Sequence, residues 1–313
     1  MIRVLLLFLG FAFLIVQHYI LPLSGQSQFI IFLTGIVLLG VPHGAADLLV
    51  ATQQAVDNKH TFKISRFFLN YLLRLFLFGI ILWCLPLTGN ILFIFFAAYH
   101  FGETDLNTFK TNTVSGKLFV TSYGLIILGI ILLAHFEEVQ PLLQQFDAGL
   151  QYSWFINFIA KYRYAILSFS GLLFFACTFF NFLINKPVTQ IQGQFLVQFI
   201  LLLFILYNMP MVMGFTFYFI LWHSVLSLRN IVGYLSKDGL FSTRIIFKQI
   251  ILYSLLAMAG IALFGLTGFM FVSNNGMLIY IFLGLAVLTA PHMQIMHDMY
   301  KSIRSSTDAV VET

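Results

Sequence analysis

Long runs of apolar residues alternate with short polar breaks along almost the whole chain. A helix needs roughly 20 mostly apolar residues to cross the hydrocarbon layer of a bilayer. The breaks leave about ten such runs, so the pattern predicts an all-α, polytopic transmembrane helix bundle with roughly eight to ten spans. The predicted spans are 4–22, 28–50, 66–85, 89–108, 117–135, 164–184, 192–208, 211–229, 246–271 and 275–300.

Some boundaries between these runs leave more than one interpretation. Only Asn208-Met209-Pro210 separates the seventh and eighth spans, which predicts either two helices or one helix kinked at the proline. The first run follows Arg3 and lacks a convincing small-residue cleavage site, so we expect a retained helix rather than a removed signal peptide. We expect residues 1–300 to form a single transmembrane domain and residues 301–313 to form a polar cytoplasmic tail.

The longest predicted outer loop, about 135–163, mixes polar residues with Tyr152, Trp154 and Phe155. Aromatic residues of this kind favour the boundary between headgroups and acyl chains. The segment therefore predicts a helix that lies in the membrane interface.

Lysine and arginine concentrate on the cytoplasmic side of membrane proteins. With a cytoplasmic N-terminus, only Lys161 and Arg163 of the 16 lysines and arginines fall on the outer side, and Arg74 falls inside a span. We therefore expect a multi-pass protein of the cell inner membrane with both termini in the cytoplasm. The residues on the predicted cytoplasmic side are Arg3, Lys59, Lys63, Arg66, Lys110, Lys117, Lys186, Arg229, Lys237, Arg244, Lys248, Lys301 and Arg304.

Composition agrees with this picture. The chain is 60% hydrophobic and 9% charged, and a soluble domain of this length would expose large apolar patches. The net charge of +5 follows from the cytoplasmic loops, and no basic run resembles a nucleic-acid patch, so we expect no nucleic-acid partner. The 38 phenylalanines are compatible with lipid-facing surfaces and also with a pocket for a large apolar ligand.

Four histidines lie inside apolar runs, in the second, fourth, eighth and tenth spans: His43, His100, His223 and His292. In the predicted topology all four spans run inward, and each histidine lies roughly 6 to 9 residues, or about 9 to 14 Å, from the inner end. Ionisable side chains in hydrocarbon are costly and usually functional. Four imidazoles at one depth predict a shared metal ion, and neutral imidazole suits iron, copper, zinc or nickel. The lack of thiolates and of clustered carboxylates argues against an iron–sulfur, calcium or magnesium site.

Polar residues accompany the histidines and predict hydrogen-bond partners that orient the ligands. Asp47 comes four residues after His43, and Glu103 comes three residues after His100, so each pair shares a helical face. His297, one turn beyond His292, is a partner or an alternative ligand, and Asp105 could instead approach the headgroups. The candidate partners are Asp47, Glu103, Asp105, Ser224 and His297.

The residues around these histidines resemble the Brp/Blh family of membrane β-carotene 15,15′-dioxygenases. The resemblance rests on four motifs, spread from the second span to the last. They are Pro42-His43-Gly44-Ala45-Ala46-Asp47, Tyr99-His100-Phe101-Gly102-Glu103-Thr104-Asp105, Trp222-His223-Ser224 and Pro291-His292-Met293. Some relatives have a second histidine shortly after the position of His223, where this chain has Ser227, Leu228 and Arg229.

The resemblance implies an enzyme that binds Fe²⁺ through His43, His100, His223 and His292. It implies that O₂ splits the central 15,15′ double bond of β-carotene into two molecules of all-trans retinal. An apolar substrate would enter from the lipid bilayer, and the retinal could pass to a microbial rhodopsin.

Other histidine-dependent membrane proteins remain as alternatives. A di-iron lipid hydroxylase or desaturase would normally carry HxxxH and HxxHH clusters, which this chain lacks. A haem carrier would use paired axial histidines. A metal or proton transporter would use a relay, whose groups tend to be staggered across the membrane rather than gathered at one depth.

Overall fold

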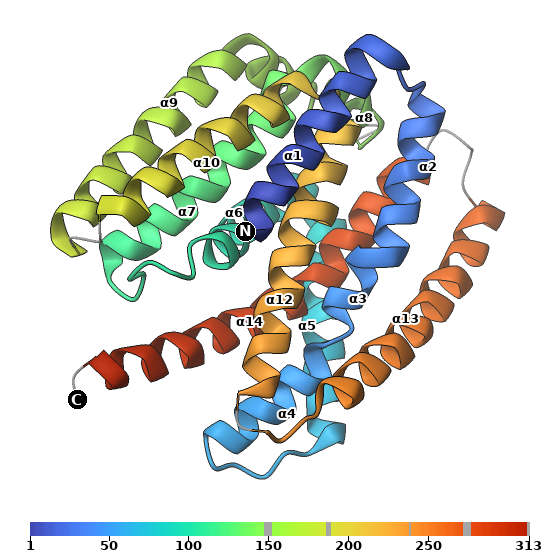
Figure 1. Ribbon diagram of the computed structural model, residues 1–313. Coiled ribbons are helices and arrows are strands. Elements are labelled where there is room, and N and C mark those ends of the chain that lie inside the picture. The colour runs from blue at the N-terminus through green and yellow to red at the C-terminus, as the bar shows by residue number, and fades with distance from the viewer. Residues whose placement is uncertain (147–151, 186–188, 238, 272–276, 312–313) are drawn as a thin grey trace. The chain divides into compact units, whose positions relative to one another are not determined.

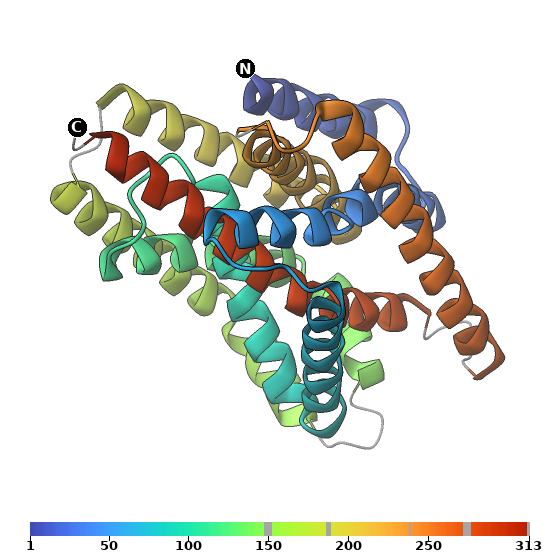
Figure 2. The same cartoon turned by 90° about the horizontal axis from the view of Figure 1, so that it is seen from below.

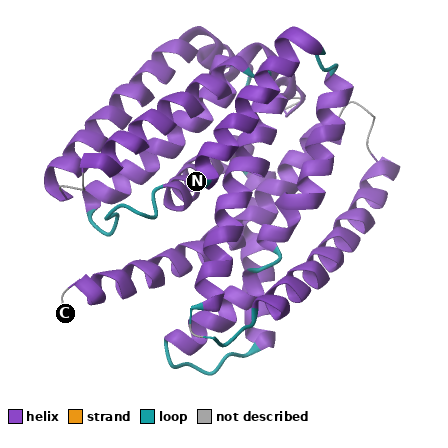
Figure 3. Cartoon of the chain, viewed as in Figure 1, coloured by secondary structure: helices purple, strands orange, loops and turns teal. Residues whose placement is uncertain are grey.

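The computed structural model (Figure 1) describes residues 1–146, 152–185, 189–237, 239–271 and 277–311. Within these ranges the regular elements are helices and no strand occurs, as the colouring of Figure 3 shows. The prediction of an all-α protein is therefore confirmed.

Each predicted span contains a helix in the described part of the chain. Several of these helices include π-helical turns, which are labelled η. In chain order the elements are α1 (Ile2–Ile15), η1 (Val16–Ile20), α2 (Gly25–Gly35), η2 (Ile36–Gly40), α3 (Val41–Gly44), α4 (Asp47–Asp57), α5 (Ile64–Cys84), α6 (Pro86–Asp105), α7 (Val114–Gly129), η3 (Ile130–Ala134), α8 (Phe136–Phe146), α9 (Ser153–Asn185), α10 (Thr189–Asn208), α11 (Met211–Phe215), η4 (Thr216–His223), α12 (Ser224–Ser236), α13 (Thr243–Phe271) and α14 (Met277–Val311).

Among the described residues, 7 helices are long and apolar enough to cross a membrane. Helices α6, α10 and α14 occupy three further predicted spans and are not among these seven. The protein is thus an all-α helix bundle of membrane type, and the total of ten crossings stays a prediction. The predicted outer loop contains helix α8, while its residues 147–151 lie outside the described ranges.

The seventh and eighth spans are two helices rather than one kinked helix. Helix α10 ends at Asn208, and Pro210 has extended backbone angles (φ −52°, ψ 150°) immediately before α11. Side chains from η1, from α8 and from the turn between η3 and α8 hold this segment. His135 Nε2 donates to the carbonyl of Tyr207 (3.1 Å), and His18 Nε2 donates to that of Asn208 (3.0 Å). Glu138 accepts the backbone N–H of Met211 (3.0 Å).

The chain forms two compact units. The first comprises Met1–Leu39 and Thr108–Val225, and the second comprises Gly40–Asn107 and Leu226–Thr313. Compact units can belong to one domain, so the grouping of residues 1–300 as a single domain stays a prediction. Helix α14 continues without interruption past residue 300 to Val311, where the sequence predicted a polar tail.

The core of the first unit contains a cluster of aromatic rings from α7, α9, α10 and the segment before α7. Helices α7 and α9 lie side by side (Figure 1), and rings of α10 fill the space against them. Neighbouring rings have centroids as close as 4.4 Å, for Phe174 and Phe199. These phenylalanines form packed core rather than a pocket. The cluster consists of Phe109, Phe119, Tyr123, Phe174, Phe182, Phe195 and Phe199.

Two glycines let helices α1 and α2 approach the π-helical element η4 closely. A Cβ atom on Gly10 would lie 2.8 Å from side-chain atoms of Ile205 and Phe217. A Cβ atom on Gly35 would lie 2.9 Å from two carbons of Ile220. Because η4 ends at His223, these contacts fix the backbone that presents this histidine.

Replacing Gly35 with alanine should therefore destabilise the first unit. Gly→Ala in a helix is normally favourable by up to about 1 kcal/mol, but overpacking a filled contact costs about 1 to 3 kcal/mol. A matched control is Gly193→Ala in α10, where the added Cβ has nothing within 4 Å. We expect Gly35→Ala to melt below the wild type in detergent and Gly193→Ala to melt at or above it. Equal melting temperatures for the two variants would contradict the close approach.

Candidate functional site

Three of the four predicted ligands meet inside the second unit. His43 lies on α3, His100 on α6 and His292 on α14, and they are 4%, 2% and 3% exposed. The His292 ring lies edge-on to both others, with ring centroids 4.9 Å from His43 and 5.2 Å from His100. Three buried imidazoles from distant parts of the sequence therefore form one cluster.

The three histidines meet because their helices run in the same direction, as expected for the second, fourth and tenth spans. Figures 1 and 2 show α14 passing alongside α4 and α6, and residue numbers rise together along each pair of helices. Between α4 and α14 the hydrogen-bonded pairs are Asp47–His292, Gln54–Ile295 and Asp57–Ser302. Between α6 and α14 they are Glu103–His297, Thr104–Tyr300 and Glu103–Arg304.

The backbone around His43 is irregular on both sides. The π-helical turn η2 precedes Pro42, and after one short helix the chain breaks at Ala45 and Ala46 before α4 begins at Asp47. Proline lacks an N–H, and its ring collides with the carbonyl one turn earlier, so a widened turn before it relieves both constraints. Pro291, by contrast, lies inside the continuous helix α14.

Asp47 pairs with His292 rather than with its neighbour in sequence. Its Oδ1 accepts a hydrogen bond from His292 Nδ1 at 2.7 Å, and its Oδ2 accepts one from the hydroxyl of Tyr71 on α5 at 3.3 Å. The helix breaks at Ala45 and Ala46, between His43 and Asp47, yet both side chains contact His292. Tyr71 is a functional candidate that sequence reasoning missed.

The hydrogen bond to Asp47 determines which ring nitrogen of His292 is available to bind a metal ion. A carboxylate accepts the Nδ1 proton, so the neutral ring carries its lone pair on Nε2. Nε2 is buried and has no hydrogen-bond partner among the described residues. A desolvated, unused lone pair is costly, and an imidazole oriented by a carboxylate is the usual form of a metal ligand. The donor set therefore fits a metal ion in residue type and in the orientation of His292.

The three histidine rings do not have the geometry of a metal site in this conformation. As the described chain stands, no three histidine, cysteine or carboxylate side chains are arranged so that they could hold a metal ion. The His292 ring meets the other two edge to face, at 80° and 83°. Sharing one ion therefore requires the rings to turn toward a common point.

His223 belongs to the first unit, where it ends η4 and is fully buried. Its ring stacks on Phe219 (centroids 6.1 Å apart), which stacks on Phe215 (5.3 Å), so a row of parallel rings leads along the helix to the histidine. Ser224 donates to the carbonyl of Phe219 at 2.9 Å and so closes the wide turn. The assignment of His223 as a ligand stays a prediction from the sequence.

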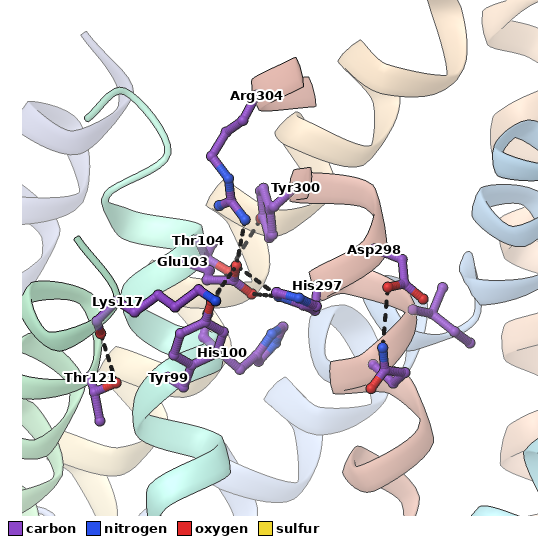
Figure 4. Close-up of polar contacts among 12 residues, drawn as sticks. Tyr99, His100, Glu103, Thr104, Lys117, Thr121, His297, Asp298, Tyr300 and Arg304 are labelled. Carbon is purple, nitrogen blue, oxygen red and sulfur yellow. Dashed lines mark hydrogen bonds and ion pairs between the residues drawn. The ribbon is translucent and has the colours of Figure 1, made fainter. Parts of the chain in front are cut away.

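Glu103 and His297 pair with each other instead of with a predicted ligand (Figure 4). The Glu103 carboxylate accepts hydrogen bonds from His297 Nδ1 (3.0 Å), Tyr99 (3.1 Å) and Arg304 (2.8 Å). His297 is thus engaged by Glu103 and is partly exposed, which favours the buried His292 over it as a ligand. Asp105 ends α6 and is buried rather than exposed at a surface.

Comparison with known proteins connects this cluster to a chemistry. A family model described as "Beta-carotene 15,15′-dioxygenase" matches residues 34–300, a range that includes the four histidines. A curated protein of the same name, from the uncultured marine bacterium 66A03, is 22% identical over 271 residues, which is 85% of this chain and 92% of that protein. No solved structure matches the chain.

Proposed function

Because the chain belongs to the β-carotene 15,15′-dioxygenase family, we propose that it splits the central 15,15′ double bond of β-carotene with O₂. The products are two molecules of all-trans retinal. The observation that carries this proposal is the family match over residues 34–300, together with the meeting of three buried histidines inside that range.

The proposed cofactor is Fe²⁺, held by His43, His100 and His292. When bound, ferrous iron supplies the redox chemistry through which O₂ reacts, and histidine ligation leaves coordination positions open. Asp47 holds His292 in the tautomer that presents Nε2. The burial of all three rings keeps water from the reacting atoms. The sequence adds His223 to the proposal as the fourth ligand.

The proposed location is the cell inner membrane. β-Carotene dissolves in hydrocarbon, so it would reach the protein laterally through the bilayer, and the long apolar helices support this route. An apolar substrate also requires no cationic pocket or phosphate loop. The retinal product could be passed to a microbial rhodopsin in the same membrane.

The proposed orientation places both termini in the cytoplasm, because lysine and arginine concentrate on that side of the predicted topology. Reporter fusions at Gln145 in α8 and at the C-terminus should therefore report opposite sides of the membrane. The same side for both fusions would overturn the orientation and the depth argument that depends on it.

The reaction can be tested by expressing the chain in cells that accumulate β-carotene. We expect the orange pigment to disappear and retinal to appear in chromatograms of the extracts, with cells that carry an empty vector as the control. Unchanged β-carotene in cells whose membranes contain the protein would contradict the proposed function.

A further inference from the structure

The end of α14 makes side-chain hydrogen bonds to three other helices of the second unit. Tyr300 donates to Thr104 of α6 and accepts from Asn230 of α12, both at 3.2 Å. Ser302 donates to Asp57 of α4 at 3.1 Å, and Arg304 donates to Glu103 of α6 at 2.8 Å. Ser302 and Arg304 follow residue 300, where the family match ends and the sequence predicted a tail.

The contact between Arg304 and Glu103 is a buried ion pair. Their side chains are 10% and 1% exposed, and Figure 4 shows Arg304, His297 and Tyr99 converging on the Glu103 carboxylate from two helices. Removing one partner of such a pair leaves the other charge buried and undercompensated, which is strongly unfavourable. The ion pair therefore fixes the position of α14 along α6 at this point.

Both ion-pair residues lie on helices that carry clustered histidines. Glu103 comes three residues after His100 on α6, and Arg304 follows His292 on the continuous helix α14. Ser302 ties α14 to Asp57 at the far end of α4, the helix that begins with Asp47, the partner of His292. These contacts hold α14 against α4 and α6, and they add to the hydrogen bond from His292 to Asp47 that holds the ring itself.

We propose that Ser302 and Arg304 form a C-terminal clasp whose function is to position His292 against His100 and His43 for sharing one metal ion. The inference rests on the proposed function, because it assumes that these histidines bind metal. Ser302 and Arg304 are positioning residues: they act through Asp57 and Glu103 and touch neither substrate nor metal.

The test compares Arg304→Gln with Lys301→Gln in the full-length protein in detergent. Lys301 lies on the same segment, carries the same charge and is exposed, so it serves as the matched control. Co²⁺ is the probe, and its affinity is measured by competition with a chelator while the visible absorption of the bound ion reports its coordination. Loss of a group bonded directly to a ligand typically weakens metal binding roughly 10- to 100-fold. Arg304 acts one contact further out, through Glu103, so we expect a loss up to the lower end of that range and an altered spectrum in Arg304→Gln. Arg304→Lys should recover much of the affinity, and Lys301→Gln should bind Co²⁺ as the wild type does.

The outcomes separate the clasp from the proposed function. Wild-type affinity and spectrum in Arg304→Gln, or an equal loss in Lys301→Gln, would overturn the clasp while leaving the enzyme proposal intact. Absence of Co²⁺ binding and retinal formation in the wild type would overturn both. If Arg304→Gln does not accumulate, Ser302→Ala serves in its place. We then expect a weaker loss of affinity in Ser302→Ala with an unchanged elution volume in size-exclusion chromatography, and wild-type affinity would overturn the clasp.

Discussion

Replacing His292 with alanine is expected to abolish both bound iron and retinal formation. The His292 ring contacts both other histidines, and its Nε2 carries a buried lone pair because Asp47 accepts the proton on Nδ1. Removing one of three or four ligands leaves too few donors to retain the ion. The same loss is expected for His43→Ala and His100→Ala and, from the sequence alone, for His223→Ala.

The measurement is the iron content of the purified protein alongside retinal formed from β-carotene. His60→Ala is the matched control, because His60 is exposed and lies in the segment between α4 and α5. It should retain iron and activity. Full iron occupancy in two or more of the variants at the clustered histidines would mean that the cluster is not the metal site.

Replacing Asp47 with asparagine is expected to reduce iron affinity and activity roughly 10- to 100-fold while leaving the protein folded in the membrane. Asparagine keeps the shape of the side chain but is a weaker acceptor, so the 2.7 Å hydrogen bond to His292 Nδ1 loses its charge. His292 then becomes less basic and less firmly oriented.

Iron content and retinal formation should be measured side by side in Asp47→Asn. Tyr71→Phe is a milder companion variant, because its hydroxyl contacts Asp47 at the longer distance of 3.3 Å, and we expect a smaller effect. Near-normal iron and activity in Asp47→Asn would remove Asp47 from the site and leave it as a helix-terminal residue.

The sequence predicts the depth of the histidines in the membrane but not their hydrogen-bond partners. Apolar runs locate the helices, and the alternation of inward and outward spans places His43, His100 and His292 on parallel helices at one depth. The Asp47–His292 hydrogen bond joins residues 245 positions apart, and local spacing carries no information about such a contact. The four-residue spacing favoured His43 as the partner of Asp47. Alanine is a strong helix former, so the sequence gives no sign that the helix breaks at Ala45 and Ala46.

The segment after residue 300 also makes contacts that the sequence does not predict. Its polar composition is typical of a cytoplasmic tail, yet α14 continues through it and buries Arg304 against Glu103. Glu103 and His297 were predicted as partners of the ligands, and their actual relation is to each other. A buried carboxylate needs donors, and that requirement, rather than position along the chain, explains why His297, Tyr99 and Arg304 gather there.

The most direct test of the account is the stoichiometry of cleavage by the purified, iron-loaded protein in detergent. β-Carotene consumed and retinal formed are quantified by chromatography, with and without O₂. The account predicts two molecules of retinal for each β-carotene, only when both iron and O₂ are present. Unequal apocarotenal fragments, or undiminished retinal formation after iron is removed, would contradict central cleavage at a histidine-bound iron.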